Sequence, residues 1–145
     1  MIPINRVTEP HFNRTQLEIN TITQEIIGCG FKVSNTLGVG FLEKVYENAL
    51  AHEIRKAGFA VAQQHPIQVY YDRIVVGEYV ADLLVEGLVI VELKAIKQLT
   101  VIEDAQCLNY IRATNVPICL LLNFGKPKMG IERFVHPLWS TLPTK

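Results

Sequence analysis

The feature that most constrains the fold of this chain is residues 79–94, which read YVADLLVEGLVIVELK. Two apolar runs rich in β-forming residues lie on either side of Gly87. They predict the two strands of a hairpin in the middle of a sheet, buried on both faces. Asp82, Glu92 and Lys94 interrupt these runs. Because burying an unpaired charge is costly, the three charges need partners or a metal ion.

Whether the acidic side chains meet depends on the register of this hairpin. Glu92 and Lys94 are two positions apart, so on a strand they share one face. A hairpin centred on Gly87 places Asp82 directly opposite Glu92, with side chains about 5 Å apart, and requires a loop of odd length or a bulge. A two-residue turn at 86–87 would place Asp82 on the other face, and the apolar pattern leaves both registers open.

The chemistry of the three charged side chains favours the register that places Asp82 opposite Glu92. Two carboxylates and one amine on the same face form a site for a hard cation with a cationic neighbour. The alternative is a structural salt bridge between Lys94 and one carboxylate, but one lysine cannot neutralise both Asp82 and Glu92. On these residues alone, a metal site is the preferred interpretation.

Length and composition predict one globular domain. The chain has 145 residues, 49% of them apolar, and a mean hydropathy of +0.20, which excludes a disordered chain. Pro3 and Pro10 discourage helix, so we expect an irregular N-terminal arm over residues 1–14 and a single domain over residues 15–145. No apolar stretch approaches the roughly 18 residues of a membrane span, and the N-terminus lacks the apolar segment of a signal peptide. We therefore expect a cytoplasmic protein without membrane contact.

The spacing of the cysteines and histidines and the net charge argue against several classes of function. The three cysteines form no CxxC pair, which predicts free thiols, and the four histidines show no zinc-ligand spacing. The 14 basic and 14 acidic residues give a net charge of zero. Neutrality argues against a large nonspecific nucleic-acid-binding protein but not against a nuclease, in which acidic metal ligands offset local basic patches.

The order of predicted elements indicates an α/β fold with a mixed central sheet. Apolar spacing predicts two helices, and a third can begin at Thr100 with Glu103 as its capping-box partner. Strand patterns surround the third helix. The expected elements are helices at about 15–37, 42–56 and 100–113, a strand at 64–71, a strand at 74–76 that leads through Gly77 into the hairpin of residues 79–94, a strand at 118–123, and an edge strand at 131–136.

Several motifs together resemble a known group of nucleases. Residues 40–46, GFLEKVY, match the signature of the bacterial family called GxxExxY proteins. Asp82 followed by Glu92-Leu93-Lys94 resembles the core of the PD-(D/E)XK nuclease superfamily, to which that family is assigned. The likeness extends from about residue 19 to residue 136, with Ala81 in place of the proline of the superfamily's name. It implies a restriction-endonuclease-like core: a helix, an antiparallel meander, a crossover helix and a parallel strand.

The resemblance also implies a metal site. Asp82 and Glu92 would hold a divalent ion, Mg²⁺ or Mn²⁺, with the Leu93 carbonyl and water molecules completing its coordination. Glu43 would face this cluster from its helix and bind the metal directly or through water. Lys94 would orient the attacking water or help to deprotonate it.

Residues beyond the metal site would contact the substrate. Gln106 and Tyr110 resemble the QxxxY helix of RecB-type nuclease domains, where these residues brace the site and contact phosphate. From their places beside predicted strand ends, Lys97, Lys126 and Lys128 are expected to hold the nucleic-acid backbone.

The implied reaction is metal-dependent hydrolysis of phosphodiester bonds in nucleic acid, with DNA as the expected substrate. The alternative is a catalytically silent nucleic-acid-binding or accessory module that keeps the nuclease fold. The sequence leaves the oligomeric state open, a homodimer included.

Overall fold

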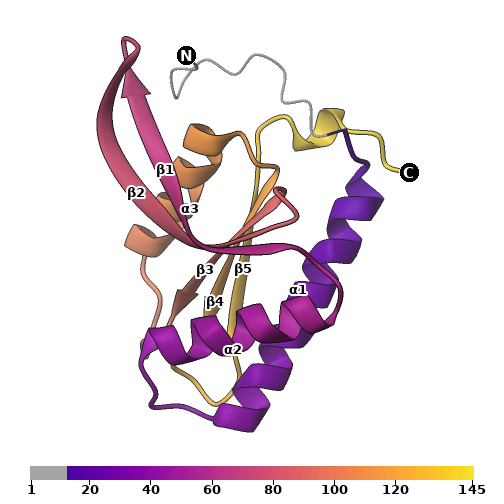
Figure 1. Ribbon diagram of the computed structural model, residues 1–145, viewed down its shortest axis with the longest axis vertical. Helices are drawn as coiled ribbons and strands as arrows, with labels where there is room; N and C mark the ends of the chain where they lie inside the picture. Colours follow the sequence, from indigo (N-terminus) through magenta and orange to yellow (C-terminus); the bar gives the residue numbers. More distant parts are fainter. Residues whose placement is uncertain (1–12) are drawn as a thin grey trace.

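A five-stranded sheet with strands in the order β1-β2-β3-β4-β5 organises the protein (Figure 1). The computed structural model describes residues 13–145. Residues 1–12, most of the expected N-terminal arm, lie outside this range. The elements are α1 (Gln16–Leu37), α2 (Glu43–Lys56), β1 (Val61–Tyr71), β2 (Ile74–Val85), β3 (Val89–Lys94), α3 (Val101–Thr114), β4 (Ile118–Asn123), β5 (Gly130–Val135) and the 3₁₀ helix η1 (Trp139–Thr141).

The mixed sheet confirms the predicted fold class. Neighbouring strands β1, β2 and β3 are antiparallel, β3 and β4 are parallel, and β4 and β5 are antiparallel. The parallel pair is joined through α3, since two parallel strands need a crossover connection. As predicted, α3 begins with a capping box in which Thr100 and Glu103 satisfy each other's backbone N–H groups. This is the restriction-endonuclease-like order of elements.

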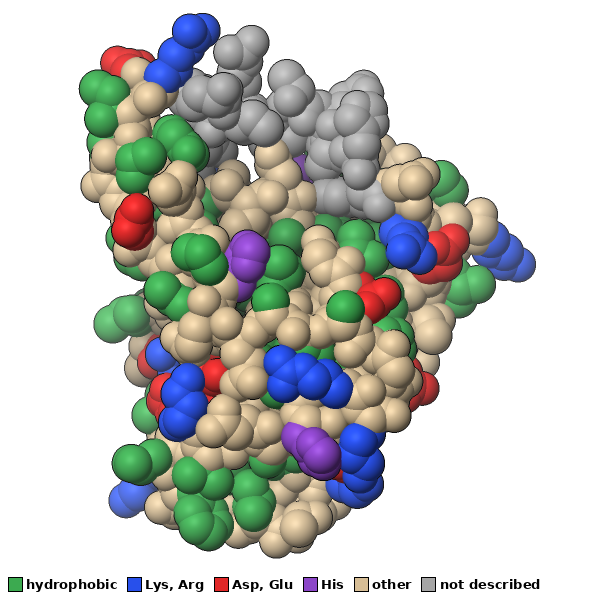
Figure 2. Space-filling view, viewed as in Figure 1, with side chains coloured by type: hydrophobic (Ala, Val, Ile, Leu, Met, Phe, Trp, Pro, Cys, Tyr) green, Lys and Arg blue, Asp and Glu red, His purple; other side chains and the backbone are tan. Residues whose placement is uncertain are grey.

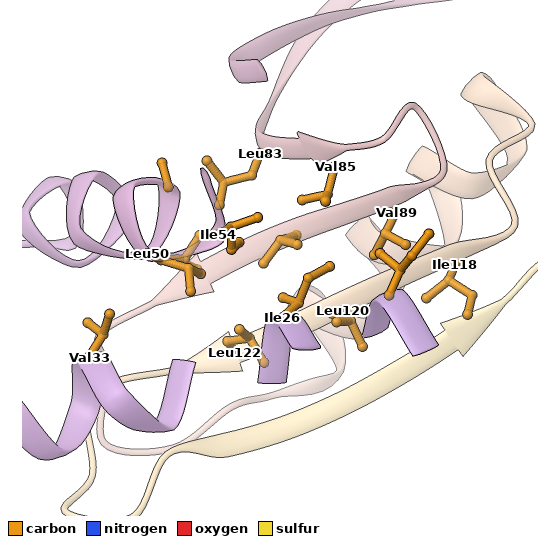
Figure 3. Packing of buried hydrophobic residues seen from close by; sticks show 14 of the residues in the cluster. Ile26, Val33, Leu50, Ile54, Leu83, Val85, Val89, Ile118, Leu120 and Leu122 are labelled. Carbon is orange, nitrogen blue, oxygen red and sulfur yellow. The ribbon is translucent and has the colours of Figure 1, made fainter. Parts of the chain in front are cut away.

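Helices cover both faces of the sheet. Helices α1 and α2 pack on one face, where alternate residues of the strands form the larger core; Figure 3 shows its centre. Helix α3 packs on the other face against a second cluster that includes Ile90, Cys119 and Leu121. Every residue of β4 is buried, and so is β3 except at Lys94. The uninterrupted apolar runs of these two strands reflect burial on both faces.

The central hairpin adopts the register centred on Gly87. Leu83 pairs with Val91 and Val85 with Val89, so the loop is residues 86–88, an odd number. Gly87 has φ +65°, a conformation that glycine adopts without strain. Continued by one pair, this register sets Asp82 opposite Glu92.

Strands β1 and β2 continue well beyond β3. The β2–β3 pairing stops at Leu83, whereas β1 and β2 stay paired as far as Tyr71 and Ile74, where Asp72 and Arg73 form the turn. We call residues 68–80 the β-arm; it projects from the body at the upper left of Figure 1. Between residues 13 and 145, no helix is long and apolar enough to span a membrane.

Candidate functional site

The candidate site lies where β2 and β3 separate. The backbone pairing of β2 with β3 ends at Leu83 and Val91. At the next pair, Asp82 and Glu92, the acceptors of the hydrogen bonds between the strands are side-chain carboxylates. The Leu93 N–H donates to Oδ2 of Asp82 at 2.8 Å, and the Asp82 N–H donates to Oε1 of Glu92 at 3.2 Å. Each acidic side chain is thereby held by a backbone N–H of the other strand, which fixes the positions of Asp82 and Glu92 relative to each other.

A local irregularity of the strands lies at Asp82, where β2 and β3 separate. Leu83 packs in the core under α1 and α2, whereas Ala81 packs in the cluster under α3, so the usual alternation of faces breaks between them. Opposite Asp82 on β1, Gln64 has φ +53°, which is uncommon for a residue other than glycine. Backbone strain of this kind is concentrated at functional sites.

Burial makes this carboxylate pair unfavourable when both groups are charged. Glu92 is only 3% exposed, and burial, with the nearby charge of Asp82, raises its pKa to about 9. Burial also raises the pKa of Asp82, although the hydrogen bond from the Leu93 N–H opposes the shift. The metal-free pair therefore retains a proton at neutral pH, where a bound cation would allow both groups to ionise.

Lys94 does not form the structural salt bridge considered above. Within residues 13–145, no ion pair joins its amine to Asp82 or Glu92. Its positive charge lowers the pKa of both carboxyl groups, but it is the smallest influence on each. Lys94 is therefore near the carboxylates without neutralising them, which leaves its amine available for another role.

The backbone at Lys94 is fixed by the turn after β4. The Phe124 N–H donates to the Lys94 carbonyl at 2.7 Å. The buried Asn123 side chain accepts from the Ile96 N–H at 3.1 Å and donates to the Ile96 carbonyl at 2.9 Å. Gly125 passes so close to Ile96 that a Cβ there would overlap its backbone. The turn formed by Asn123, Phe124 and Gly125 thus fixes the backbone at Lys94.

Tyr46, the tyrosine of the GxxExxY signature, is structural. It is fully buried and stacks on Phe124 with ring centroids 4.8 Å apart. Its hydroxyl donates to the Gly38 carbonyl at 2.6 Å and accepts from the Phe41 N–H at 3.2 Å. This tyrosine connects the loop before α2 to the turn that holds Lys94.

The structure brings Glu47, which was not among the predicted site residues, near Asp82. Glu43 is exposed in the first turn of α2 and makes no hydrogen bond or ion pair within the described part of the chain. Glu47 is 3% exposed, and its negative charge raises the pKa of Asp82. Glu47 therefore lies near Asp82, a place that was expected for Glu43.

Four hydrogen bonds hold the Glu47 carboxylate. Lys44 donates to both of its oxygens, at 3.0 and 3.1 Å. Gln63 donates to Oε2 at 2.8 Å and Gln64 to Oε1 at 2.6 Å. Consecutive strand residues normally point to opposite faces, so it is the positive φ of Gln64 that lets both glutamines reach one carboxylate.

Sequence reasoning missed Glu47, although a signal was present. Leu50, Ala51 and Ile54 are all fully buried, and with Glu47 they follow the i, i+3, i+4, i+7 spacing of a core-facing stripe. A carboxylate on an apolar stripe needs a partner or a function. Glu43, four residues earlier, lies on the same helix face but in the exposed first turn of α2.

Helix α3 places two further predicted residues beside the cluster. Gln106 donates to the Tyr110 hydroxyl at 2.8 Å, as their spacing of four predicts. Burial raises the pKa of Tyr110, and the charge of Glu92 raises it further. Both residues line a pocket of about 700 Å³ that Lys94 also lines. Gln106, Tyr110 and Lys94 are thus brought together.

The three predicted backbone-contacting lysines lie in two loops at the same edge of the sheet. All three are exposed. Lys97 follows β3, and Lys126 and Lys128 follow β4. Because β3 and β4 are parallel and pair Lys94 with Asn123, both loops leave the sheet beside the candidate site.

The donor set fits a divalent cation only with help from backbone and water. Among the described residues, no three or more His, Cys, Asp or Glu side chains are grouped so as to hold a metal ion. Asp82 and Glu92 each use one oxygen for a backbone N–H, which leaves Oδ1 and Oε2 for a cation. Oxygen-rich sites that keep several waters suit Mg²⁺ and Mn²⁺.

Comparison with known proteins gives one match. A family model described as the PD-(D/E)XK nuclease superfamily matches residues 20–134, most of the chain. Searches of the curated proteins and of the solved structures found no significant match.

Proposed function

The chain belongs to the PD-(D/E)XK nuclease superfamily, and from this premise we propose that it is a divalent-metal-dependent nuclease that hydrolyses phosphodiester bonds, with DNA as substrate. The observation that carries the proposal is the opposed pair Asp82 and Glu92, whose burial raises both carboxyl pKa values. We further propose that residues 15–145 act as one nuclease domain and that the GxxExxY signature marks its subfamily.

In the proposed site, Asp82, Glu92 and the Leu93 carbonyl hold Mg²⁺ or Mn²⁺. When bound, such an ion lowers the pKa of coordinated water and offsets charge on the scissile phosphate. Burial of the two carboxyl groups supports this assignment, because a cation relieves the repulsion that otherwise keeps a proton on the pair.

The other residues act around this centre. Lys94 stabilises the attacking hydroxide and the charge that develops on phosphate, for which its amine, in no ion pair among residues 13–145, is suited. Glu47, from α2, adds negative charge beside Asp82 and so favours a bound cation, and its four hydrogen bonds fix its carboxylate there. Gln106 and Tyr110 contact the phosphate, and Lys97, Lys126 and Lys128 hold the flanking backbone.

Calorimetric titration with Mn²⁺ tests the metal site. Wild type should bind, and Asp82→Ala should bind much more weakly because it loses a ligand. Glu78→Ala, which removes an exposed carboxylate of the β-arm, serves as the matched control and should bind as wild type does. Equal affinity of Asp82→Ala and wild type would remove the metal-site proposal.

Two further variants and a cleavage assay complete the test. Glu47→Ala should weaken Mn²⁺ binding or cleavage more than Glu43→Ala does; the opposite order would restore the role first expected of Glu43. Single-stranded, duplex and branched DNA and RNA should be tried with Mn²⁺. If wild type binds metal but cleaves none of them, the chain is the catalytically silent binding or accessory module.

A further inference from the structure

The pocket beside the carboxylate cluster is formed by three elements that meet only in the folded protein. Val69 and Tyr79 line it from the β-arm, Lys94 from the end of β3, and Ile102, Gln106 and Tyr110 from α3, among others. Its volume, about 700 Å³, lies within the range of roughly 300–1,000 Å³ typical of small-molecule sites. It is large enough for a group the size of a nucleotide.

The lining combines aromatic rings with unused amide groups. The rings of Tyr79 and Tyr110 lie 6.1 Å apart at 58°, and Tyr79 is 53% exposed, so one ring remains open to a ligand. The amide of Asn109 makes no hydrogen bond within the described residues, and Gln106 uses only its NH₂ group, towards Tyr110. A planar group with polar edges, such as a nucleobase, matches both features.

Charge and position favour a nucleotide over other planar ligands. Among the residues that the structure describes, no Asp or Glu lines the pocket, and Lys94 supplies a positive charge. Lys94 is also two residues from Glu92, so a base in the pocket would be attached to a backbone that passes the carboxylate cluster. A base held in a duplex keeps both faces stacked and its pairing edge occupied, so it cannot enter.

We propose that this pocket binds an unpaired base of the substrate strand, so that the protein selects single-stranded or locally unpaired nucleic acid. This inference rests on the proposed function, because it places the base next to the phosphate to be cleaved. Tyr79 provides the stacking surface, and the amide of Asn109 contacts the edge of the base.

Binding is tested with a single-stranded oligonucleotide that contains 2-aminopurine, with Ca²⁺ in place of Mg²⁺ and strand integrity checked on a gel. Wild type should quench the 2-aminopurine fluorescence and bind this strand more tightly than the same strand annealed to its complement. Tyr79→Ala should weaken binding of the single strand roughly 5- to 150-fold, the loss expected for one stacked base, and should abolish the quenching. Tyr79→Phe should retain both.

Tyr71→Ala is the matched control, since Tyr71 is 69% exposed on the same strand pair but does not line the pocket. It should leave affinity and quenching unchanged. Equal binding by Tyr79→Ala and wild type, or preference for the duplex, would overturn the inference. So would a loss of self-association in Tyr79→Ala, measured by light scattering, without a change in affinity for the strand; the β-arm would then be an interface between copies of the chain.

The two proposals fail in different ways. If the base is bound but no strand is cleaved with Mn²⁺, the nuclease proposal fails and the pocket remains. If Mn²⁺ supports cleavage and Tyr79→Ala cleaves single strands as well as wild type does, the pocket proposal fails and the nuclease remains.

Discussion

The two halves of β2 have similar compositions and opposite surroundings. In the half that we call the root, residues 81–85, Ala81, Leu83 and Val85 are completely buried. In the half that belongs to the β-arm, Ile74 is 64% exposed and Val76 is 59% exposed. Figure 2 shows hydrophobic side chains gathered on the arm at its upper left.

The difference comes from the neighbours of the strand. The root pairs with β1 on one side and β3 on the other, whereas the arm pairs with β1 alone. Apolar β-forming sequence therefore does not by itself mean core. In the root, the apolar residues surround the carboxyl groups of Asp82 and Glu92 and exclude water from them. In the arm, the apolar residues provide an exposed surface next to the proposed site. Exposed apolar surface of this kind often marks an interaction site.

The largest expected effect concerns the root: the free energy of unfolding of the metal-free protein should depend on pH. Glu92 keeps its proton up to about pH 9 when folded, but in the unfolded chain it loses the proton near its ordinary pKa of 4.5. Between these values the folded state binds more protons, so the free energy of unfolding should fall as pH rises, by up to about 1.4 kcal/mol per pH unit. Urea denaturation between pH 5 and pH 9 in the presence of a chelator measures this.

Glu92→Gln should flatten that profile and stabilise the metal-free protein at pH 8. Glu78→Gln, a change at an exposed carboxylate of the arm, should leave the profile unchanged. A wild-type profile as flat as that of Glu92→Gln would show that burial in the root does not control this carboxyl group.

The next largest effect concerns catalysis. Lys94→Ala should lower the single-turnover cleavage rate about 10²–10³-fold while largely sparing Mn²⁺ binding, because the lost amine stabilises charge in the transition state and is not a metal ligand. Arg73→Ala removes an exposed cation at the tip of the arm and should change the rate only slightly. Equal cleavage by Lys94→Ala, Glu92→Ala and wild type would identify the activity as a contaminant.

The smallest effect compares one substitution in both halves of β2. Val85→Ala should cost about 2 kcal/mol of stability, because it removes two buried methyl groups and leaves a cavity. Val76→Ala should change stability by less than about 0.5 kcal/mol, since its side chain already contacts water. Chemical denaturation of both variants at one pH checks this, and equal losses would mean that the arm is covered in solution.

Much of the fold could be predicted because its signals are local. Thr15 and Thr100 cap their helices; apolar spacing predicted the first of these two helices, and a capping box predicted the second. The continuous run of β4 predicted a strand buried on both faces. The register that sets Asp82 opposite Glu92 was one of two alternatives, and hydrogen bonds between the two strands settled it.

The sequence by itself determined the order of the elements, the fold class and the three charges in the central hairpin, because these depend on neighbouring residues along the chain. Only the tertiary structure showed that the charge of Glu47 reaches Asp82, because which turn of α2 lies beside the carboxylates depends on how the helix packs on the sheet. It also decided where β2 leaves β3 and that the β-arm and α3 enclose a pocket. These features arise from contacts between residues distant in sequence, which a local pattern does not encode.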